Sequence, residues 1–332
     1  MPEAIEEAEL VLDGVRVFYR RVPGEGTPTV YCHGNPTHSE DWLPFMLRGG
    51  PSIAIDMPGW GRSDRPDPAR FDYSMYGLSA FLERCLDELG VTQRKLVVHD
   101  WGSLALIGAQ RRPDLVEKLV IVNVVPLLPG YRWHWVARVW RNRPLGELAN
   151  ATTTRASMAL TMRQAKGDRS SMPPELVDMV WRYWDKGAQA AILALYRHAN
   201  PDRLVAAGKD QNKLTCPTLV LWGDRDPYLP TRFAHAYAQA LPDAELEIVP
   251  GAGHWPWIDD PPGHRPHPQL RGIGRLLEEG QGGLPRELVS SAAPEPESPF
   301  VAGSRGRPPW PSLIAPVNHP ITIVGCLVRF RR

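Results

Sequence analysis

The chain is 332 residues long, with 43% hydrophobic and 23% charged residues and a formal net charge of +1. This composition is typical of a soluble globular protein that can bury a large core. A nearly neutral chain offers no extended basic surface, so nucleic acid is not expected as a partner.

The sequence predicts neither a secretory signal nor a membrane span. Residues 1–10, "MPEAIEEAEL", are acidic and lack the basic-then-apolar pattern of a signal peptide. The longest apolar stretch, 119–128, is interrupted by Asn123 and Pro126 and is too short to cross a bilayer. We therefore expect a cytoplasmic protein without a membrane partner.

The cysteines give no sign of a metal site or a disulfide framework. They are widely spaced in the chain: Cys32, Cys85, Cys216 and Cys326. Because no CxxC or Cys/His cluster occurs, we expect buried or idle thiols in a reducing compartment. No metal and no cofactor are predicted.

The first part of the chain alternates apolar runs with amphipathic helical patterns. Residues 9–22 predict an opening hairpin around Asp13 and Gly14, and 74–89 and 103–112 predict helices. Further apolar runs end in turn residues, as buried parallel strands do: 29–34, 52–59, 95–100 and 117–125. This alternation predicts a parallel sheet with helices on both faces.

The remaining chain is expected to divide into three parts. Residues 126–213 are rich in Trp, Arg, Met and helix formers and predict a helical cap. Residues 214–260 resume the sheet and complete a core that begins with residues 1–125. Residues 261–332 are rich in Pro, Gly and Arg and predict an atypical, poorly ordered tail, in which 268–280 offers a short helix.

Short polar stretches follow predicted strands at one rim of this sheet. They are "HGNP" (33–36), "HDWGS" (99–103), "GDRDP" (223–227) and "GAGHW" (251–255). Ligands bind outside the carboxyl ends of strands in open α/β sheets. The stretches supply a turn with free backbone donors, a carboxylate at a strand-to-helix elbow, a second carboxylate and a histidine. Nucleophile, acid and histidine in that chain order form a hydrolase triad.

With these four motifs in order, residues 28–260 resemble the α/β-hydrolase superfamily, and within it the aspartate-nucleophile branch of haloalkane dehalogenases and epoxide hydrolases. The resemblance implies a mostly parallel central sheet flanked by helices, with an inserted cap. It also implies Asp100 as nucleophile, His254 as base and Asp226 as acid. A carboxylate is already ionised at neutral pH and attacks at carbon, leaving an alkyl ester that His254-activated water hydrolyses.

The residues around Asp100 indicate which leaving group the enzyme releases. "HGNP" with "VVHDWGS" resembles haloalkane dehalogenases, which implies that Asn35 and Trp101 donate side-chain N–H groups to the halide. Their backbone N–H groups are expected to form the oxyanion hole. Epoxide hydrolases have glycine where this chain has Val98, so a dehalogenase-like hydrolase that releases alcohol and halide is favoured over an epoxide hydrolase that yields a vicinal diol.

Three aromatic residues of the cap are candidate substrate contacts. Tyr196, in "ALYRHANP", stands where epoxide hydrolases have an acidic tyrosine, and Tyr131 or Tyr183 is the candidate second one. In "RWHW", His134 and Trp135 resemble the His-Trp pair of haloacetate dehalogenases.

A haloacid substrate is nevertheless disfavoured, because those enzymes carry an arginine where this chain has Trp101. Dehalogenases with "HGNP" often take their acid from the position of Asn123, so Asp226 must serve here, in preference to Asp224. His33 and His99 are expected to be structural.

Other functions are weighed against this one. A non-catalytic ligand-binding homologue is the second alternative, and an esterase is disfavoured because Ser103 lies past the elbow. The expected partners are a small apolar organic substrate and water. The sequence does not define the oligomeric state.

Overall fold

The computed structural model describes residues 5–48 and 50–259. The predicted tail at 261–332, with its short helix and Cys326, lies outside the described residues. No helix in the described part of the chain is both long and apolar enough to cross a membrane.

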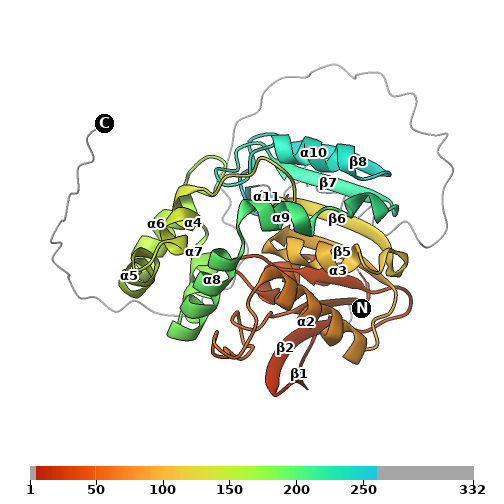
Figure 1. The fold of residues 1–332 in the computed structure, drawn as a ribbon, viewed down its shortest axis with the longest axis horizontal. Coiled ribbons are helices and arrows are strands. Elements are labelled where there is room, and N and C mark those ends of the chain that lie inside the picture. The colour runs from red at the N-terminus through yellow and green to blue at the C-terminus, as the bar shows by residue number, and fades with distance from the viewer. Residues whose placement is uncertain (1–4, 49, 260–332) are drawn as a thin grey trace, which may run out of the picture. The chain divides into compact units, whose positions relative to one another are not determined.

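An eight-stranded sheet in the order β1-β2-β4-β3-β5-β6-β7-β8 organises the fold (Figure 1). The strands are β1 Glu6–Leu12, β2 Val15–Val22, β3 Thr29–Cys32, β4 Ser52–Ile55, β5 Arg94–Asp100, β6 Val116–Val124, β7 Thr218–Gly223 and β8 Ala244–Val249. The β1–β2 and β2–β4 pairs are antiparallel, and all other pairs are parallel. The mostly parallel sheet predicted from the apolar runs is confirmed.

The opening hairpin is set by its turn. Asp13 and Gly14 both have positive φ angles, 52° and 76°, as a two-residue hairpin turn requires. The register then pairs Leu12 with Val15, so the predicted hairpin is confirmed.

The described helices pack against the sheet or form the insertion that connects β6 to β7 in the chain. The α-helices are α1 Leu43–Met46, α2 Met75–Glu88, α3 Ala105–Ala109, α4 Trp135–Arg141, α5 Leu145–Thr152, α6 Arg155–Arg163, α7 Pro174–Arg182, α8 Lys186–His198, α9 Pro201–Ala207, α10 Arg232–Ala240 and α11 Pro256–Asp259. Short 3-10 turns complete them: η1 Ser39–Trp42, η2 Trp101–Leu104, η3 Pro113–Leu115 and η4 Gln211–Lys213.

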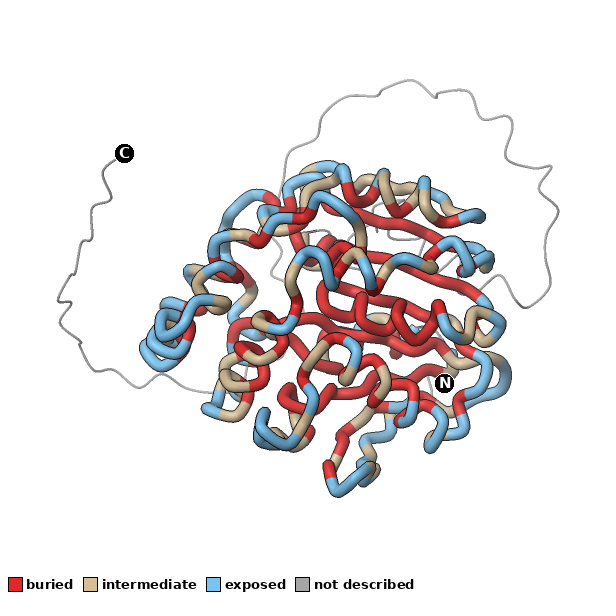
Figure 2. Tube along the Cα trace, viewed as in Figure 1, coloured by how far each residue is buried: buried red, intermediate tan, exposed pale blue. Residues whose placement is uncertain are grey.

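The sheet is apolar on both faces, because alternate residues of each central strand enter different clusters. Leu96 and Val98 of β5 pack with α2, α3, α9 and α10 on one face. Val97 packs with η1, α1 and α11 on the other. Figure 2 shows the central strands buried along their length. Burial on both faces explains why these strands are continuous apolar runs.

A buried ion pair fixes α2 against the sheet. Arg94, at the start of β5, donates from Nη2 to both carboxylate oxygens of Glu83, at 2.7 and 2.9 Å. Gly108 of α3 faces the same carboxylate, because a Cβ there would lie 2.7 Å from Glu83 atoms. The close packing of α2, α3 and β5 holds the carboxyl end of β5 in one position.

The helices between β6 and β7 lie over the carboxyl ends of the strands. Figure 1 shows α4 to α8 gathered beyond one end of the sheet. Helix α9 returns to the core, where Gln110 Nε2 donates to the carbonyl oxygen of Ala207 at 2.9 Å. Met158 and Met162 of α6 join the apolar cluster that continues from the sheet.

Candidate active site

Asp100 occupies a strained turn at the end of the central strand β5. Its φ of 48° and ψ of −118° are unusual for a side-chain-bearing residue, and η2 begins at the next residue. The β5–β6 register shifts between His99 and Asp100. The backbone therefore turns sharply and lifts the carboxylate above the sheet, as a nucleophile elbow does.

Two glycines of the sequence motifs make room for this elbow. A Cβ at Gly34 would lie 2.3 Å from the Cβ of Asp100. A Cβ at Gly102 would lie 2.3 Å from the carbonyl oxygen of Cys32. Both distances are far below van der Waals contact, so each position requires glycine.

The structure brings together the residues predicted to form a triad. His254 Nδ1 lies 2.7 Å from Asp226 Oδ2, and its Nε2 lies 3.6 Å from Asp100 Oδ2. All three side chains are buried. Asp224, the competing acid, instead accepts a hydrogen bond from the Gly251 backbone N–H at 2.7 Å. The imidazole is thus placed between two carboxylates.

Asn123 completes the surroundings of Asp226 and was not predicted as a site residue. Its Nδ2 donates to Asp226 Oδ2 at 2.7 Å, and its Oδ1 accepts from the Gly223 N–H at 3.0 Å. The backbone N–H groups of Tyr228 and Leu229 donate to Asp226 Oδ1 at 2.8 and 3.1 Å. An amide at Asn123 therefore orients the acid. The sequence signals were a polar residue at the end of a buried strand and its place at the position where dehalogenases with "HGNP" often carry the acid.

Charge and burial act in opposite directions on the triad. Burial lowers the pKa of His254, but the charge and hydrogen bond of Asp226 and the charge of Asp100 outweigh it, so the net shift is upward. Burial raises the pKa of Asp100, and His254 and the backbone N–H groups of Asn35 and Trp101 partly oppose this. The site therefore favours the charged form of His254 more than water does, whereas burial disfavours the charged form of Asp100.

Two N–H side chains predicted for the leaving group lie beside Asp100. The backbone N–H of Asn35 donates to Asp100 Oδ1 at 2.7 Å, while its Oδ1 accepts from Trp60 Nε1 at 3.1 Å. This bond turns the Nδ2 group of Asn35 away from Trp60. Asn35 Nδ2 and Trp101 Nε1 are buried, and neither completes a hydrogen bond within the described residues.

The phenol of Tyr196 joins these donors. Its ring packs edge-on against Trp101, with ring centroids 5.1 Å apart. Burial and then the charge of Asp100 raise its pKa well above the usual range, and the neighbouring donors of Trp101 and Asn35 partly offset this rise. Tyr196 therefore stays protonated beside Asp100.

A cavity of about 170 Å³ opens onto Asp100. The sequence predicted these lining residues: Asn35, Asp100, His134, Trp135, Tyr196 and His254. Trp101 is buried and is not among the lining residues, but its ring packs against that of Tyr196, which is, with ring centroids 5.1 Å apart. Other lining residues were not predicted as contacts, among them Trp140, Asn150, Trp184, Tyr228 and Trp255. The wall is aromatic, with few polar groups, as expected of a small-molecule site.

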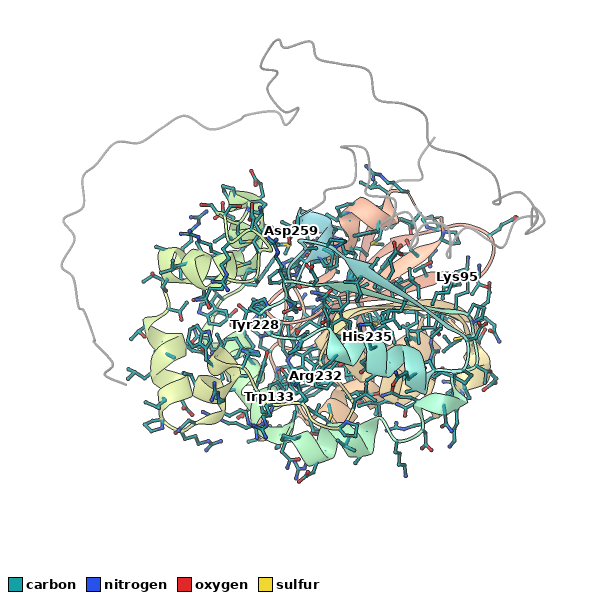
Figure 3. The ribbon with its side chains drawn as sticks, turned by 90° about the horizontal axis from the view of Figure 1, so that it is seen from above. Lys95, Trp133, Tyr228, Arg232, His235 and Asp259 are labelled. Atoms are coloured by element: carbon teal, nitrogen blue, oxygen red, sulfur yellow. The ribbon has the colours of Figure 1, made fainter. Side chains whose placement is uncertain are left out.

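The two tyrosines named from the sequence as candidate partners of Tyr196 lie outside the cavity wall. Tyr183 packs edge-on against His38, with ring centroids 4.9 Å apart, and Tyr131 packs against Trp133 at 5.0 Å. Neither lines the cavity. Tyr228 does, and Figure 3 shows it where the core meets the cap helices. Tyr228 belongs to the loop after β7, whereas both tyrosines named from the sequence belong to the cap.

Tyr228 packs directly against the catalytic candidates. Its ring centroid lies 5.4 Å from that of His254 and 4.6 Å from that of His134. Burial and the charge of His254 lower the pKa of His134 to about 4, so His134 is neutral near neutral pH. His134 also accepts a hydrogen bond from the Ala137 N–H at 3.4 Å and caps α4. Trp135 is half exposed and donates to Gln164 Oε1 at 3.1 Å.

The predicted structural role of two histidines is confirmed. His33 Nε2 accepts from the Met57 N–H at 3.1 Å, so its Nδ1 donates to the Gly34 carbonyl at 2.8 Å. His99 Nε2 lies 2.8 Å from the carbonyl oxygen of His254, to which it donates. In the described part of the chain, no His, Cys, Asp and Glu group is arranged to hold a metal.

An acid, a histidine and an elbow carboxylate at the carboxyl ends of a mostly parallel sheet, beneath inserted helices, define an α/β-hydrolase-type enzyme. Residues 27–261 match the family described as alpha/beta hydrolase fold. The chain belongs to this family and is a hydrolase.

Comparison with curated proteins gives similarities to several activities. Epoxide hydrolase 3 of Mus musculus is 26% identical over 264 residues, covering 73% of this chain and 70% of that protein. A haloalkane dehalogenase of Bradyrhizobium diazoefficiens is 34% identical over 136 residues, 40% of this chain and 43% of that protein. A cis-3-alkyl-4-alkyloxetan-2-one decarboxylase of Xanthomonas campestris is 29% identical over 272 residues, 70% of this chain and 84% of that protein.

The fold also resembles solved structures. A loop variant of the haloalkane dehalogenase DbeA from Bradyrhizobium elkanii superposes with a TM-score of 0.70 at 23% identity, covering 83% of this chain and 97% of that one. The resemblance to the superfamily, and to both dehalogenases and epoxide hydrolases within it, is confirmed by these matches.

Proposed function

We propose that Asp100 is the nucleophile of a haloalkane dehalogenase-like hydrolase, which converts a small apolar organic halide and water into an alcohol and a halide ion. The observation that carries this proposal is the pair of buried N–H groups, Asn35 Nδ2 and Trp101 Nε1, which have the Tyr196 hydroxyl as a neighbour but form no full hydrogen bond within the described residues. A neutral hydroxyl satisfies two such donors poorly, and an anion that appears during turnover would accept from both.

In the first half-reaction, a carboxylate oxygen of Asp100 attacks the carbon that bears the halogen. The new carbon–oxygen bond forms as the carbon–halogen bond breaks, and the halide departs with the bonding electrons. Asn35 Nδ2 and Trp101 Nε1 donate to the departing halide. Neither group is charged, so neither forms an ion pair with Asp100 that would compete with attack.

In the second half-reaction, His254 Nε2 removes a proton from water, and the resulting hydroxide attacks the ester carbonyl of Asp100. The backbone N–H groups of Asn35 and Trp101 stabilise the tetrahedral oxyanion. Its collapse expels the alkoxide, which takes the proton held by His254 and leaves as the alcohol. The Asp100 carboxylic acid then loses its proton to solvent, which restores the carboxylate. The 2.7 Å contact with Asp226 holds the imidazole in the required tautomer and stabilises its charged form. These steps require no cofactor.

A strained oxygen ring is the second candidate electrophile. The Tyr196 hydroxyl lies beside Asn35 and Trp101, near the charge of Asp100. An O–H group can transfer a proton to a departing ring oxygen, which a halide does not require. Relatives named as an epoxide hydrolase and an oxetanone decarboxylase cover more of this chain than the haloalkane dehalogenase does.

Mass spectrometry of the His254→Gln variant tests these candidates. Without its base the variant accumulates the covalent ester, and a proteolytic map places the added mass on the peptide that contains Asp100. Butyl bromide adds a butyl group and releases bromide. Styrene oxide or a cis-dialkyl oxetan-2-one adds the whole ring-opened molecule.

Each result of that experiment assigns the substrate class. An adduct with butyl bromide alone supports the dehalogenase. An adduct with a strained ring alone supports a ring-opening hydrolase in its place. The His254→Gln, Asp100→Asn double variant is the control and forms no adduct. Adducts with none of these probes would favour a non-catalytic ligand-binding protein.

A further inference from the structure

Asn150 of α5 is a buried polar residue in the cavity wall that the two half-reactions do not use. It is 2% exposed and lines the cavity. Its Oδ1 accepts a hydrogen bond from Trp140 Nε1 at 2.7 Å. Because an indole N–H only donates, the oxygen of the amide must face Trp140, and the NH2 group must be on the other branch.

That NH2 group has no acceptor among the described residues. A buried amide donor left unpaired is unfavourable, so its position in a ligand cavity requires an explanation. The hydrogen bond from Trp140 fixes the amide, which is therefore already oriented for a ligand. A preorganised donor is typical of a group that selects substrates.

Asn150 lies on the cap side of the cavity, and aromatic rings connect it to the nucleophile elbow. Trp140 packs against Tyr196 with ring centroids 4.9 Å apart, and Tyr196 packs against Trp101 at 5.1 Å. Asn150 and Asp100 line the same cavity from a cap helix and from the end of β5, so one ligand can place different atoms at the two residues.

The wall also indicates the charge of that ligand atom. The described residues that line the cavity include no Lys or Arg, and the pKa of His134 is lowered to about 4 by burial and by His254. An anionic group would lack a counter-charge and would be repelled by Asp100. A neutral oxygen acceptor suits the site better.

We propose that Asn150 is a specificity-determining residue that binds a neutral oxygen acceptor, such as a carbonyl or ether oxygen, on a part of the substrate other than the reacting carbon. That this part differs from the reacting carbon rests on the proposed function, in which that carbon lies at Asp100. Binding of the acceptor itself does not, so it is measured with ligands that do not react.

Cyclohexanone and methylenecyclohexane are a suitable pair of ligands, because they differ mainly in an oxygen in place of a CH2 group. Trp135, Trp140, Trp184 and Trp255 line the cavity, so quenching of intrinsic fluorescence reports binding. Wild-type protein is expected to bind the ketone about tenfold more tightly than the alkene. Asn150→Leu is expected to reduce this ratio to about one.

Asn150→Leu also removes the oxygen that accepts the hydrogen bond from Trp140. A second variant separates this loss from the loss of the NH2 group. Asn150→Asp keeps an oxygen for Trp140 and replaces the NH2 group with another oxygen, so above neutral pH it also loses the ketone preference. Thr161→Val is the matched control, because Thr161 lines the same cavity but its hydroxyl already donates to the Ser157 carbonyl at 3.0 Å. Its ketone preference is expected to match wild type.

Equal binding of the two ligands by wild type, or a ketone preference that survives in both Asn150 variants, would overturn the proposal. Failure of the proposed function shows itself separately, as the absence of a covalent adduct in His254→Gln. Ketone selectivity that depends on Asn150 would stand whatever the result with that variant.

Discussion

The rim of the sheet and the helical cap hold their functional side chains by different means. At the rim, backbone groups hold the carboxylates: the Asn35 N–H donates to Asp100, and the Tyr228 N–H donates to Asp226. In the cap, Tyr196 is held mainly by ring packing against Trp140 and its neighbours. Backbone contacts fix a position regardless of side-chain identity, whereas ring packing changes with each substitution. We therefore expect rim substitutions to abolish chemistry and cap substitutions to alter substrate choice.

The largest effect is expected at the elbow. Asp100→Asn removes the oxygen that we propose as the nucleophile, so turnover should fall by at least about 10⁴-fold. Initial rates of bromide release and diol formation measure the loss. Asp224→Asn is the matched control, because that exposed carboxylate bonds to the nearby turn at Gly251, and its rates should stay close to wild type. Comparable losses in the two variants would contradict the assignment.

The acid of the triad is expected to give the next largest effect, with a change in pH dependence. The pKa of His254 is raised against burial by Asp226, and ester hydrolysis requires the neutral imidazole. Hydrolysis should therefore fall as pH decreases through this raised pKa. Asp226→Asn should slow hydrolysis by about 10³–10⁴-fold and move the acid limb to lower pH. Single-turnover rates across pH measure both quantities.

Asn123→Ala is the control for that shift. It removes the amide hydrogen bond to Asp226 but keeps the carboxylate and its charge. The rate should fall less than in Asp226→Asn, and the acid limb should move less. An acid limb that stays in place in Asp226→Asn would show that Asp226 does not set the pKa of His254.

A cap substitution should separate the two candidate electrophiles. Tyr196→Phe keeps the ring that packs on Trp101 and Trp133 but removes the hydroxyl. Opening of a strained oxygen ring should slow by about 10²-fold, whereas halide release should change by less than about threefold. Tyr131→Phe is a control, because Tyr131 is buried but does not line the cavity. Equal slowing of both reactions would show that Tyr196 contributes by packing and does not donate a proton to the ring oxygen.

The smallest effect on activity is expected at Asp41, where the readout is stability. Burial raises the pKa of this carboxyl to about 7, against donors on Thr37 and Trp255. The folded state therefore keeps a proton that the unfolded chain loses near pH ~4, and the free energy of unfolding falls as pH rises from there through about 7.

Asp41→Asn should remove that dependence. The variant should be more stable than wild type above neutral pH, by up to ~4 kcal/mol, and this difference should shrink in mild acid. Urea unfolding at both pH values measures it. A stability difference that does not change with pH would contradict the raised pKa.

Much of the fold and of the rim could be predicted from the sequence, because local patterns determine them. Continuous apolar runs identified the buried strands, and the polar motifs that follow them identified the strand ends at the rim. The order of the polar strand-end motifs placed Asp100, Asp226 and His254 at one rim, since parallel strands end at the same edge.

Only the tertiary structure decided which polar groups join these residues. Asn123 and Asp226 come from different strand ends and meet because β6 and β7 are neighbours. Tyr228 and Asn150 line one cavity although they lie in a core loop and in the cap. The sequence pattern determines which side chains are buried, but partners distant in the chain are set by how helices and strands pack. A buried donor such as the Asn150 amide is therefore recognised only when all its neighbours are known.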